Sequence, residues 1–339
     1  MIKEAILKLA RGEDISYKIA RSSMDEIMNG EATDVQMSAY LTALSLKGET
    51  ISEITASAES MRNHCVKLLH DMDVLEIVGT GGDGSNSFNI STISSIVISA
   101  GGVPVAKHGN RAASSACGAA DVLESLGVNI EISPEESTSL LEEIGICFLF
   151  AQNYHISMKY VAPIRRELGI RTIFNILGPL SNPAGANREV MGVYNESLVL
   201  PLAQVLCNLG LKNAMVVYGQ DGLDEISISA PTTICEIKDG EFTNYELKPE
   251  DFGLERSDKN EIVGGSPKVN AQIALDILNG EKSAKRDAIL LNSGAGLYIG
   301  GKVNSIEKGI DIAAKVLDNG KAKNQLDKFI NLSNQFQLF

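Results

Sequence analysis

The sequence contains no tryptophan and no run of eighteen apolar residues, so its pattern predicts no membrane-spanning helix. Its first stretch, MIKEAILKLARGED, indicates an amphipathic helix with acids and is not typical of a signal peptide. The five cysteines are widely scattered and never form a C-x-x-C pair. We therefore expect buried, reduced thiols in a cytoplasmic protein that has neither a zinc site nor a membrane partner.

Basic residues are also scarce, because 30 lysines and arginines face 43 acids and give a net charge of -13. This charge repels nucleic acid and anionic membranes, so neither is expected as a partner. It repels a phosphorylated substrate as well, unless local cations or a metal ion reverse the sign. A basic cluster beside a glycine-rich turn is therefore informative in this sequence.

A chain of 339 residues is too long for one ordinary core, and we expect a large α/β domain with a smaller partner. Residues 1–70 carry apolar side chains at helical spacing and predict a small helical bundle. Thr50 and Glu53 form a capping-box pattern for a helix that runs to about Leu69. The apolar face that such a bundle leaves uncovered predicts a homodimer. Glycines break the helical pattern at Gly12, Gly30 and Gly48.

From residue 74 the pattern changes to strands that alternate with helices, which predicts a mostly parallel sheet covered on both faces. The expected strands are 74–78, 103–106, 146–150, 190–194 and 214–218. Expected helices include 119–126 and 134–144. Residues 233–237 and 242–247 predict a β-hairpin, and the chain from Pro267 onward is expected to be helical.

Two polar turns follow the first two expected strands. The first, residues 79–84, reads GTGGDG, and residues 89–92 (NIST) then open a helix that closes at Gly101 and Gly102. Glycines before a helix start offer unpaired N–H groups and a positive dipole end to an anion. The second turn, residues 107–111, reads KHGNR. Parallel strands end on the same sheet edge, so both turns are expected to face one crevice.

Asp224 and Glu225 follow the expected strand 214–218, again at a carboxyl end. Two adjacent carboxylates suit one or two Mg²⁺ ions that bridge to substrate phosphates, although the pair taken alone favours a solvated acidic loop. Arg165 lies in an expected helix, 161–169. There it either binds a carboxylate in a bidentate manner or remains a surface cation.

Only four histidines occur in the sequence. His64 and His70 are expected on helix surfaces. His108 and His155 fall in expected turns and are candidates for a functional role.

Gly79, Gly81 and Gly84 satisfy the G-x-G-x-x-G pattern of dinucleotide binding. That site expects an acidic residue about twenty positions on, at the end of the next strand. Lys107 and His108 occupy that place, which argues against a dinucleotide. A Walker A loop is excluded because no Gly-Lys-Ser/Thr follows the glycines.

Five motifs in this order resemble the anthranilate phosphoribosyltransferase family of tryptophan biosynthesis, and the resemblance covers essentially the whole chain. They lie at residues 79–83, 89–92, 107–111, 171–183 and 224–225. The resemblance implies transfer of the phosphoribosyl group of phosphoribosyl pyrophosphate (PRPP) to the amine of anthranilate, with release of pyrophosphate.

The resemblance also implies a nucleoside-phosphorylase-like fold in a homodimeric enzyme. Residues 1–70, completed by about 165–185, would form the helical domain, and residues 73–339 the α/β domain. Pyrimidine nucleoside phosphorylases share this architecture and are the second candidate, but their basic phosphate motif carries serine in place of the residues at 107–111. A noncatalytic nucleotide-binding protein is the third candidate.

The resemblance assigns PRPP to Gly79, Gly82, Asp83, Ser87, Asn89, Ile90, Ser91, Thr92, Lys107, His108, Gly109, Asn110, Arg111, Ala112, Ala113, Ser114, Ser115 and Ala119. It assigns anthranilate to Gly79, His108, Asn110, His155, Arg165 and Gly178. It assigns Mg²⁺, as two ions per subunit, to Ser91, Asp224 and Glu225. The chain departs from the family at Ala119 and Cys117, where serine is usual, and Ser87 replaces a threonine. Loss of one hydroxyl contact costs on the order of 1 kcal/mol, so Ala119 is expected to affect PRPP affinity more than activity.

Overall fold

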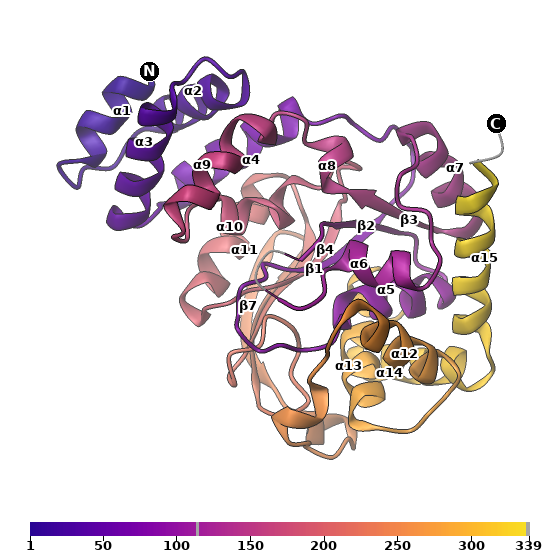
Figure 1. Cartoon of the computed structure of the whole chain (residues 1–339). Coiled ribbons are helices and arrows are strands. Elements are labelled where there is room, and N and C mark those ends of the chain that lie inside the picture. The colour runs from indigo at the N-terminus through magenta and orange to yellow at the C-terminus, as the bar shows by residue number, and fades with distance from the viewer. Residues whose placement is uncertain (113–114, 337–339) are drawn as a thin grey trace.

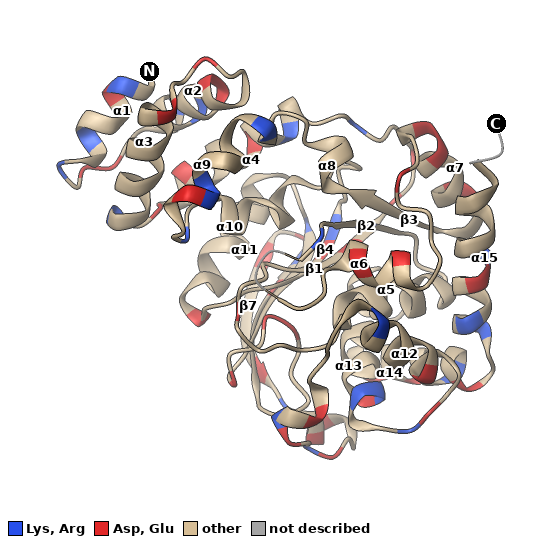
Figure 2. Cartoon of the chain, viewed as in Figure 1, with Lys and Arg blue, Asp and Glu red and all other residues tan. Residues whose placement is uncertain are grey.

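The computed structural model describes residues 1–112 and 115–336, in which a small helical lobe stands beside a larger α/β body (Figure 1). Two predicted site residues, Ala113 and Ser114, lie outside the described residues. None of the helices in the described ranges is both long enough and apolar enough to cross a membrane. Charged residues of both signs are spread over the outer helices in the view of Figure 2.

The first lobe contains the expected helical bundle. Its helices are α1 (Ile2–Leu9), α2 (Tyr17–Met28), α3 (Asp34–Lys47) and α4 (Ile51–His64). Thr33 and Thr50 each form a capping box, which fixes the starts of α3 and α4. The predicted breaks at Gly12, Gly30 and Gly48 are confirmed, and all three glycines have positive φ.

The prediction that the fourth helix runs to about Leu69 is wrong. α4 ends at His64, because the N–H groups of Val66 and Leu68 donate to the distant carbonyls of Tyr154 and Pro183. His70 therefore lies outside any helix, and its ring hydrogen-bonds the Ala184 carbonyl.

The larger body is built on one seven-stranded sheet with the order β3-β2-β1-β4-β5-β6-β7. The first five strands are parallel, and β6 and β7 add the expected antiparallel hairpin. The strands are β1 (Leu75–Gly79), β2 (Val105–Gly109), β3 (Ile146–Phe150), β4 (Arg188–Gly192), β5 (Asn213–Gly219), β6 (Thr232–Lys238) and β7 (Glu241–Leu247). The predicted mostly parallel sheet is confirmed.

Helices cover both faces of this sheet. Along β5, Met215 and Val217 join the core under α5 and α13, whereas Ala214 and Val216 join the core that reaches α11 and the helical lobe. Alternation of this kind, with both sides apolar, is what a doubly covered sheet requires. The helices that follow α4 in the chain are α5 (Ile90–Ala100), α6 (Ala119–Ser125), α7 (Pro134–Ile144), α8 (Ala151–Tyr154), α9 (Met158–Leu168), α10 (Phe174–Leu177), α11 (Val199–Asn208), α12 (Pro267–Leu278), α13 (Ala284–Ile299), α14 (Ile306–Asp318) and α15 (Lys321–Gln335).

The expected boundary between the helical domain and the α/β domain, after residue 70, stays a prediction. Two features of the packing support it: α9 packs against α2 and α3, and α10 packs against α4. The segment expected to complete the helical domain, 165–185, thus reaches the N-terminal helices in space.

The second strand differs from the expectation. We predicted a strand at 103–106 followed by a polar turn, but β2 begins at Val105 and includes Lys107 and His108. It pairs with β3 along its full length, whereas it pairs with β1 at one position, Val105 with Leu75, near the starts of the two strands. β1 and β2 therefore separate toward their carboxyl ends, beside the predicted crevice.

Candidate active site

The site lies where the strand order reverses between β1 and β4, at their carboxyl ends. The two strands end at register partners, Gly79 and Gly192. A Cβ on Gly79 would lie 2.4 Å from Asp224 Oδ2, and a Cβ on Gly192 would lie 1.7 Å from the Asp224 carbonyl oxygen. Only glycine at both strand ends allows the loop after β5 to lie across this edge.

The glycine-rich loop and the acid pair contact each other directly. The Gly81 N–H donates to Asp224 Oδ2 at 2.6 Å, and the Asp224 N–H donates to Asp83 Oδ2 at 3.3 Å. At the start of α5, the Ser91 N–H donates to Glu225 Oε1 at 3.1 Å. The structure thus brings together the predicted loop, the predicted helix start and the predicted acids, which lie far apart in the sequence.

Both carboxyl groups of the pair are buried and held at raised pKa values. Burial, followed by the neighbouring Asp83, raises the pKa of Asp224 to about 7. Burial, followed by Asp224, raises the pKa of Glu225 to about 8. Within residues 1–112 and 115–336, no lysine or arginine forms an ion pair with either group. A cation placed beside them would remove this electrostatic cost.

These residues fit a magnesium ion better than a transition metal. No group of three His, Cys, Asp or Glu side chains suited to a metal occurs in the described part of the chain. Mg²⁺ usually keeps several waters and takes one or two carboxylates together with substrate phosphates. The Asp224 and Glu225 carboxylates, with the Ser91 hydroxyl nearby on α5, supply oxygen ligands of that kind.

Lys107 is buried in β2 and is not presented by a turn. The residue is 3% exposed, and its Nζ donates to the His108 carbonyl at 3.1 Å. Nζ also lies 3.8 Å from Oε1 of Glu76, an acid that we did not single out from the sequence. An acid inside a buried strand was the available signal, because unpaired acids are rarely buried.

His108 and His155 stand beside each other, with ring centroids 5.0 Å apart. Burial lowers the pKa of both, to about 4 for His155, so both rings are neutral at pH 7. Nε2 of each ring is buried without a hydrogen-bond partner among the described residues. Two neutral rings with free nitrogen atoms are suited to receive a polar substrate group.

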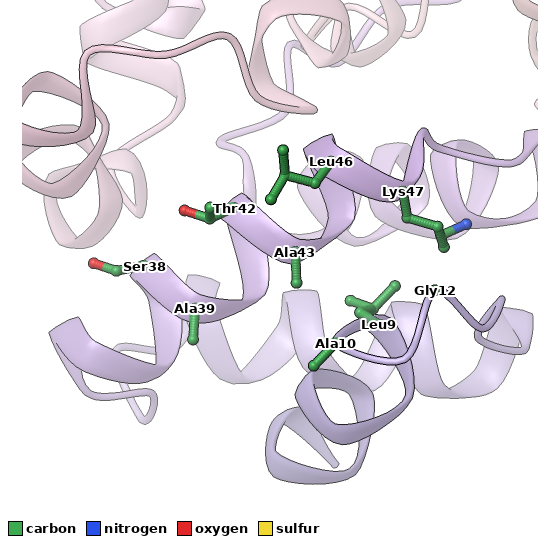
Figure 3. A pocket seen from close by; sticks show the side chains of 9 residues that line it. All are labelled: Leu9, Ala10, Gly12, Ser38, Ala39, Thr42, Ala43, Leu46 and Lys47. Carbon is green, nitrogen blue, oxygen red and sulfur yellow. The ribbon is translucent and has the colours of Figure 1, made fainter.

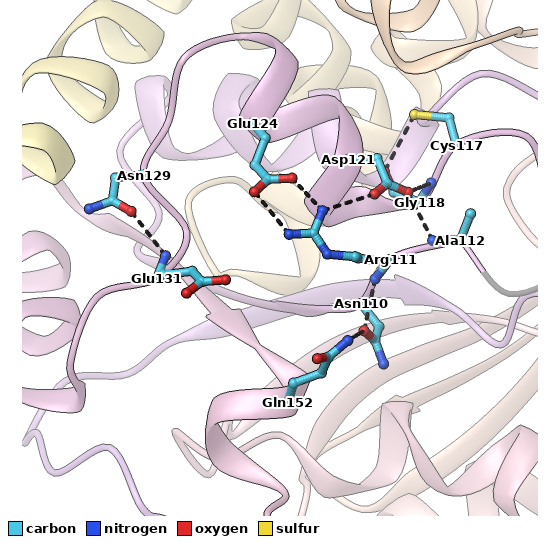
Figure 4. A network of polar contacts seen from close by, with 10 residues as sticks. All are labelled: Asn110, Arg111, Ala112, Cys117, Gly118, Asp121, Glu124, Asn129, Glu131 and Gln152. Atoms are coloured by element: carbon cyan, nitrogen blue, oxygen red, sulfur yellow. Dashed lines mark hydrogen bonds and ion pairs between the residues drawn. The ribbon is translucent and has the colours of Figure 1, made fainter. Parts of the chain in front are cut away.

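The loop after β2 folds back on α6 (Figure 4). The N–H groups of Ala112 and Gly118 both donate to Asp121 Oδ2 at 2.9 Å, which closes the loop. Arg111 pairs with Asp121 and Glu124 and lies 5.4 Å above the Phe150 ring. Arg111 is therefore already engaged by acids and is not a free cation in this arrangement.

The other predicted PRPP residues line these same loops. Asn89 joins the loop after β2 to α12, since its Nδ2 donates to the Cys117 carbonyl and its Oδ1 accepts from Asn270. A Cβ on Gly109 would lie 2.9 Å from Ala119, which packs these positions tightly together. The remaining positions lie on the loop before α5, in its first turn and after β2: Gly82, Ser87, Ile90, Thr92, Asn110 and Ser115.

Arg165 lies on α9 and stacks 5.2 Å above the Phe174 ring. Burial lowers its pKa, and none of the ion pairs among the described residues involves it. Gly178 follows α10. The sequence reasoning did not assign a role to Arg171, whose Nη2 donates to the Gly82 carbonyl at 2.5 Å.

Residues 71–323 match the family model described as the glycosyl transferase family, a/b domain, and residues 3–65 match the helical bundle domain of that family. The anthranilate phosphoribosyltransferase of Methanobrevibacter smithii is 66% identical over 98% of this chain and 100% of its own length. The anthranilate phosphoribosyltransferase of Lachnoclostridium phytofermentans is 62% identical over 99% of this chain and 100% of its own length.

Solved structures agree. Anthranilate phosphoribosyltransferase from Thermus thermophilus superimposes with a TM-score of 0.93 at 43% identity, over 98% of this chain and 99% of that one. The Saccharomyces cerevisiae enzyme in complex with PRPP and Mg gives a TM-score of 0.91 at 27% identity, over 98% of each chain. Since these similarities extend over nearly the whole chain, the protein belongs to the anthranilate phosphoribosyltransferase family.

Proposed function

We propose that the crevice above β1 and β4 holds PRPP and anthranilate, and that it forms N-(5-phosphoribosyl)anthranilate and pyrophosphate. The observation that carries this proposal is the contact of the glycine-rich loop and the α5 start with Asp224 and Glu225. This contact puts amide donors and carboxylates where a diphosphate and its metal ion would meet.

The reaction breaks the bond between C1′ of the ribose and the pyrophosphate oxygen, forms a bond from C1′ to the amine nitrogen, and releases one proton from that nitrogen. Negative charge grows on the departing pyrophosphate, so preorganised donors and cations stabilise the transition state. Ser91, Asp224 and Glu225 would hold Mg²⁺, which supplies positive charge to the pyrophosphate when bound. Amides of the glycine-rich loop and the Lys107 ammonium add to that charge.

Anthranilate requires a partner for its carboxylate and a neutral environment for its amine. Arg165 is partly buried and has no acid partner among the described residues, so its guanidinium is available to a carboxylate. His108 and His155 are neutral and carry free Nε2 atoms that can accept or donate a hydrogen bond to the substrate. Positioning both substrates together supplies much of the rate in reactions of this type.

A turnover assay tests the proposal. Anthranilate is fluorescent, so its consumption in the presence of PRPP and Mg²⁺ should appear as a loss of fluorescence, with pyrophosphate released in equal amount. A parallel incubation with uridine or thymidine and phosphate should release no free base. Release of free base, or binding of PRPP without formation of pyrophosphate, would contradict the proposed transferase activity.

We further propose that the protein forms a homodimer through the helical lobe and works in the cytoplasm. α1 and α3 leave a hollow of about 640 Å³ between them (Figure 3), and one of its lining residues, Leu46, is 83% exposed. The hollow is lined mainly by small and apolar side chains: Leu9, Ala10, Gly12, Ser38, Ala39, Thr42, Ala43, Leu46 and Lys47. An exposed apolar surface of this kind suits a second copy of the chain.

Leu46→Glu should turn the dimer into a monomer, because two copies of the same charged group would face an apolar interface. Light scattering after size exclusion measures the mass. Val269→Glu, at a 49% exposed apolar position on α12, is the matched control and should leave the dimer intact. A monomeric unaltered chain would contradict the proposal.

A further inference from the structure

Glu76 fills the gap that opens between β1 and β2. Its Oε2 accepts a hydrogen bond from the His108 N–H at 2.9 Å and another from Asn182 Nδ2. The same Asn182 nitrogen donates to the Ala106 carbonyl at 2.8 Å. Two side chains therefore satisfy backbone groups of β2 that a continuous ladder with β1 would otherwise pair.

The second oxygen of Glu76 faces the buried lysine. Its Oε1 lies 3.8 Å from Lys107 Nζ, and among the described residues no other carboxylate lies within ion-pair distance of that nitrogen. Glu76 is 0% exposed and Lys107 is 3% exposed. Burying an ammonium is costly unless an opposite charge lies beside it, and Glu76 is the acid beside Lys107.

A second buried acid lies one strand away and makes no such contact. Glu189 on β4 is the register partner of Glu76 and is 1% exposed. Its Oε1 has no hydrogen-bond partner in the described ranges, and it forms no ion pair there. Both acids are therefore buried in the sheet, but of the two only Glu76 contacts β2.

We propose that Glu76 is a positioning residue for PRPP: it holds the Lys107 side chain in place and fixes the end of β2, so that both are positioned for the diphosphate. This inference rests on the proposed function. Glu76 does not touch the substrate in this scheme: its charge acts on Lys107, and its bond to His108 involves only the backbone N–H. Substitution of Glu76 should therefore weaken the binding of PRPP more than the binding of anthranilate.

Two substitutions separate the charge of Glu76 from its hydrogen bonds. Glu76→Gln keeps an acceptor for His108 but removes the charge beside Lys107, whereas Glu76→Asp keeps the charge at a greater distance. We expect Glu76→Gln to raise the KM for PRPP about tenfold and Glu76→Asp about threefold, as expected for weakening one buried charge pair. The KM for anthranilate should stay within about twofold in both. Calorimetric titration of each protein with PRPP and Mg²⁺ should give the same order of affinities.

Glu189→Gln is the matched control and should change neither KM by more than about twofold. An unchanged KM for PRPP in Glu76→Gln, a milder effect than that of Glu76→Asp, or equal effects on both substrates would overturn the inference. If Glu76→Gln does not fold by circular dichroism, Glu76→Asp decides through the split between the two KM values. Absence of turnover in the unaltered chain would instead defeat the proposed function, so the two failures are distinguishable.

Discussion

At the scale of single residues, the acid pair carries the clearest expectation. Asp224→Asn combined with Glu225→Gln should lower kcat at least about 100-fold, because oxygen ligands and charge for Mg²⁺ are lost. The double variant should still fold, since both carboxyl groups are buried at raised pKa values and are costly to ionise. Steady-state turnover across a Mg²⁺ titration measures the effect. Asp239→Asn, in the β6–β7 turn, is the control, and near-normal turnover in the double variant would refute the metal role.

Neighbouring arginines on α9 offer a second comparison at this scale. Arg165 is partly buried against Phe174, whereas Arg166 is exposed. Arg165→Ala should raise the KM for anthranilate about tenfold or more and leave the KM for PRPP nearly unchanged, since a charged hydrogen-bond pair is worth about 1.5–3 kcal/mol. Arg166→Ala should change neither value. Equal effects of Arg165→Ala on the two substrates would contradict its role at the carboxylate.

At the scale of elements, the strand ends set the position of the acid loop. A Cβ at Gly192 would lie 1.7 Å from the Asp224 carbonyl, so Gly192→Ala must displace that loop. We expect a loss of about 1–3 kcal/mol in unfolding free energy, together with most of the Mg²⁺-dependent turnover. Gly12→Ala is strained at φ +74° but has open space around it, so it should cost stability and leave turnover intact. Full activity in Gly192→Ala would show that the close approach is unnecessary.

Element boundaries were predictable from the sequence where the signals were local. α7 begins at Pro134 after the capping residue Ser133 and ends before Gly145 in the left-handed conformation, so its predicted bounds are confirmed. The end of β2 was not predictable, because Lys107 and His108 look like turn residues in the sequence. They lie in a strand because β2 pairs with β3 along its full length, while Glu76 and Asn182, both distant in sequence, bond its backbone on the β1 side.

At the scale of the whole molecule, strand and helix alternation together with the motif order was sufficient to predict the two-part architecture and the meeting of the loops. The sequence pattern could not provide the strand order, nor the glycine at 192 on which the site depends. That glycine becomes informative only when the loop after β5 is placed over it. The buried acids Glu76 and Glu189 likewise appear as register partners only in the assembled sheet.

The buried acids also make the stability of the whole protein depend on pH. The folded pKa values of Glu76, Asp224 and Glu225 are about 7, 7 and 8, above their unfolded values. From pH 6.5 to pH 8 the folded state therefore binds more protons than the unfolded state, and stability falls as pH rises. His108 and His155, whose pKa values burial lowers, oppose this trend below about pH 7.5, where unfolded histidines begin to bind protons, but at pH 6.5 they do not outweigh the three acids.

Urea unfolding at pH 6.5 and pH 8, without Mg²⁺ or PRPP, measures this dependence. Each titrating acid contributes a slope of at most about 1.4 kcal/mol per pH unit. The double variant Asp224→Asn with Glu225→Gln should show a shallower slope, because only Glu76 among the three still titrates. Mg²⁺ with PRPP should restore stability most at pH 8, since the ligand favours ionised carboxylates. A protein that is equally stable, or more stable, at pH 8 would show that these carboxyl groups ionise freely in the folded chain and that the crevice is more open to water than its burial indicates.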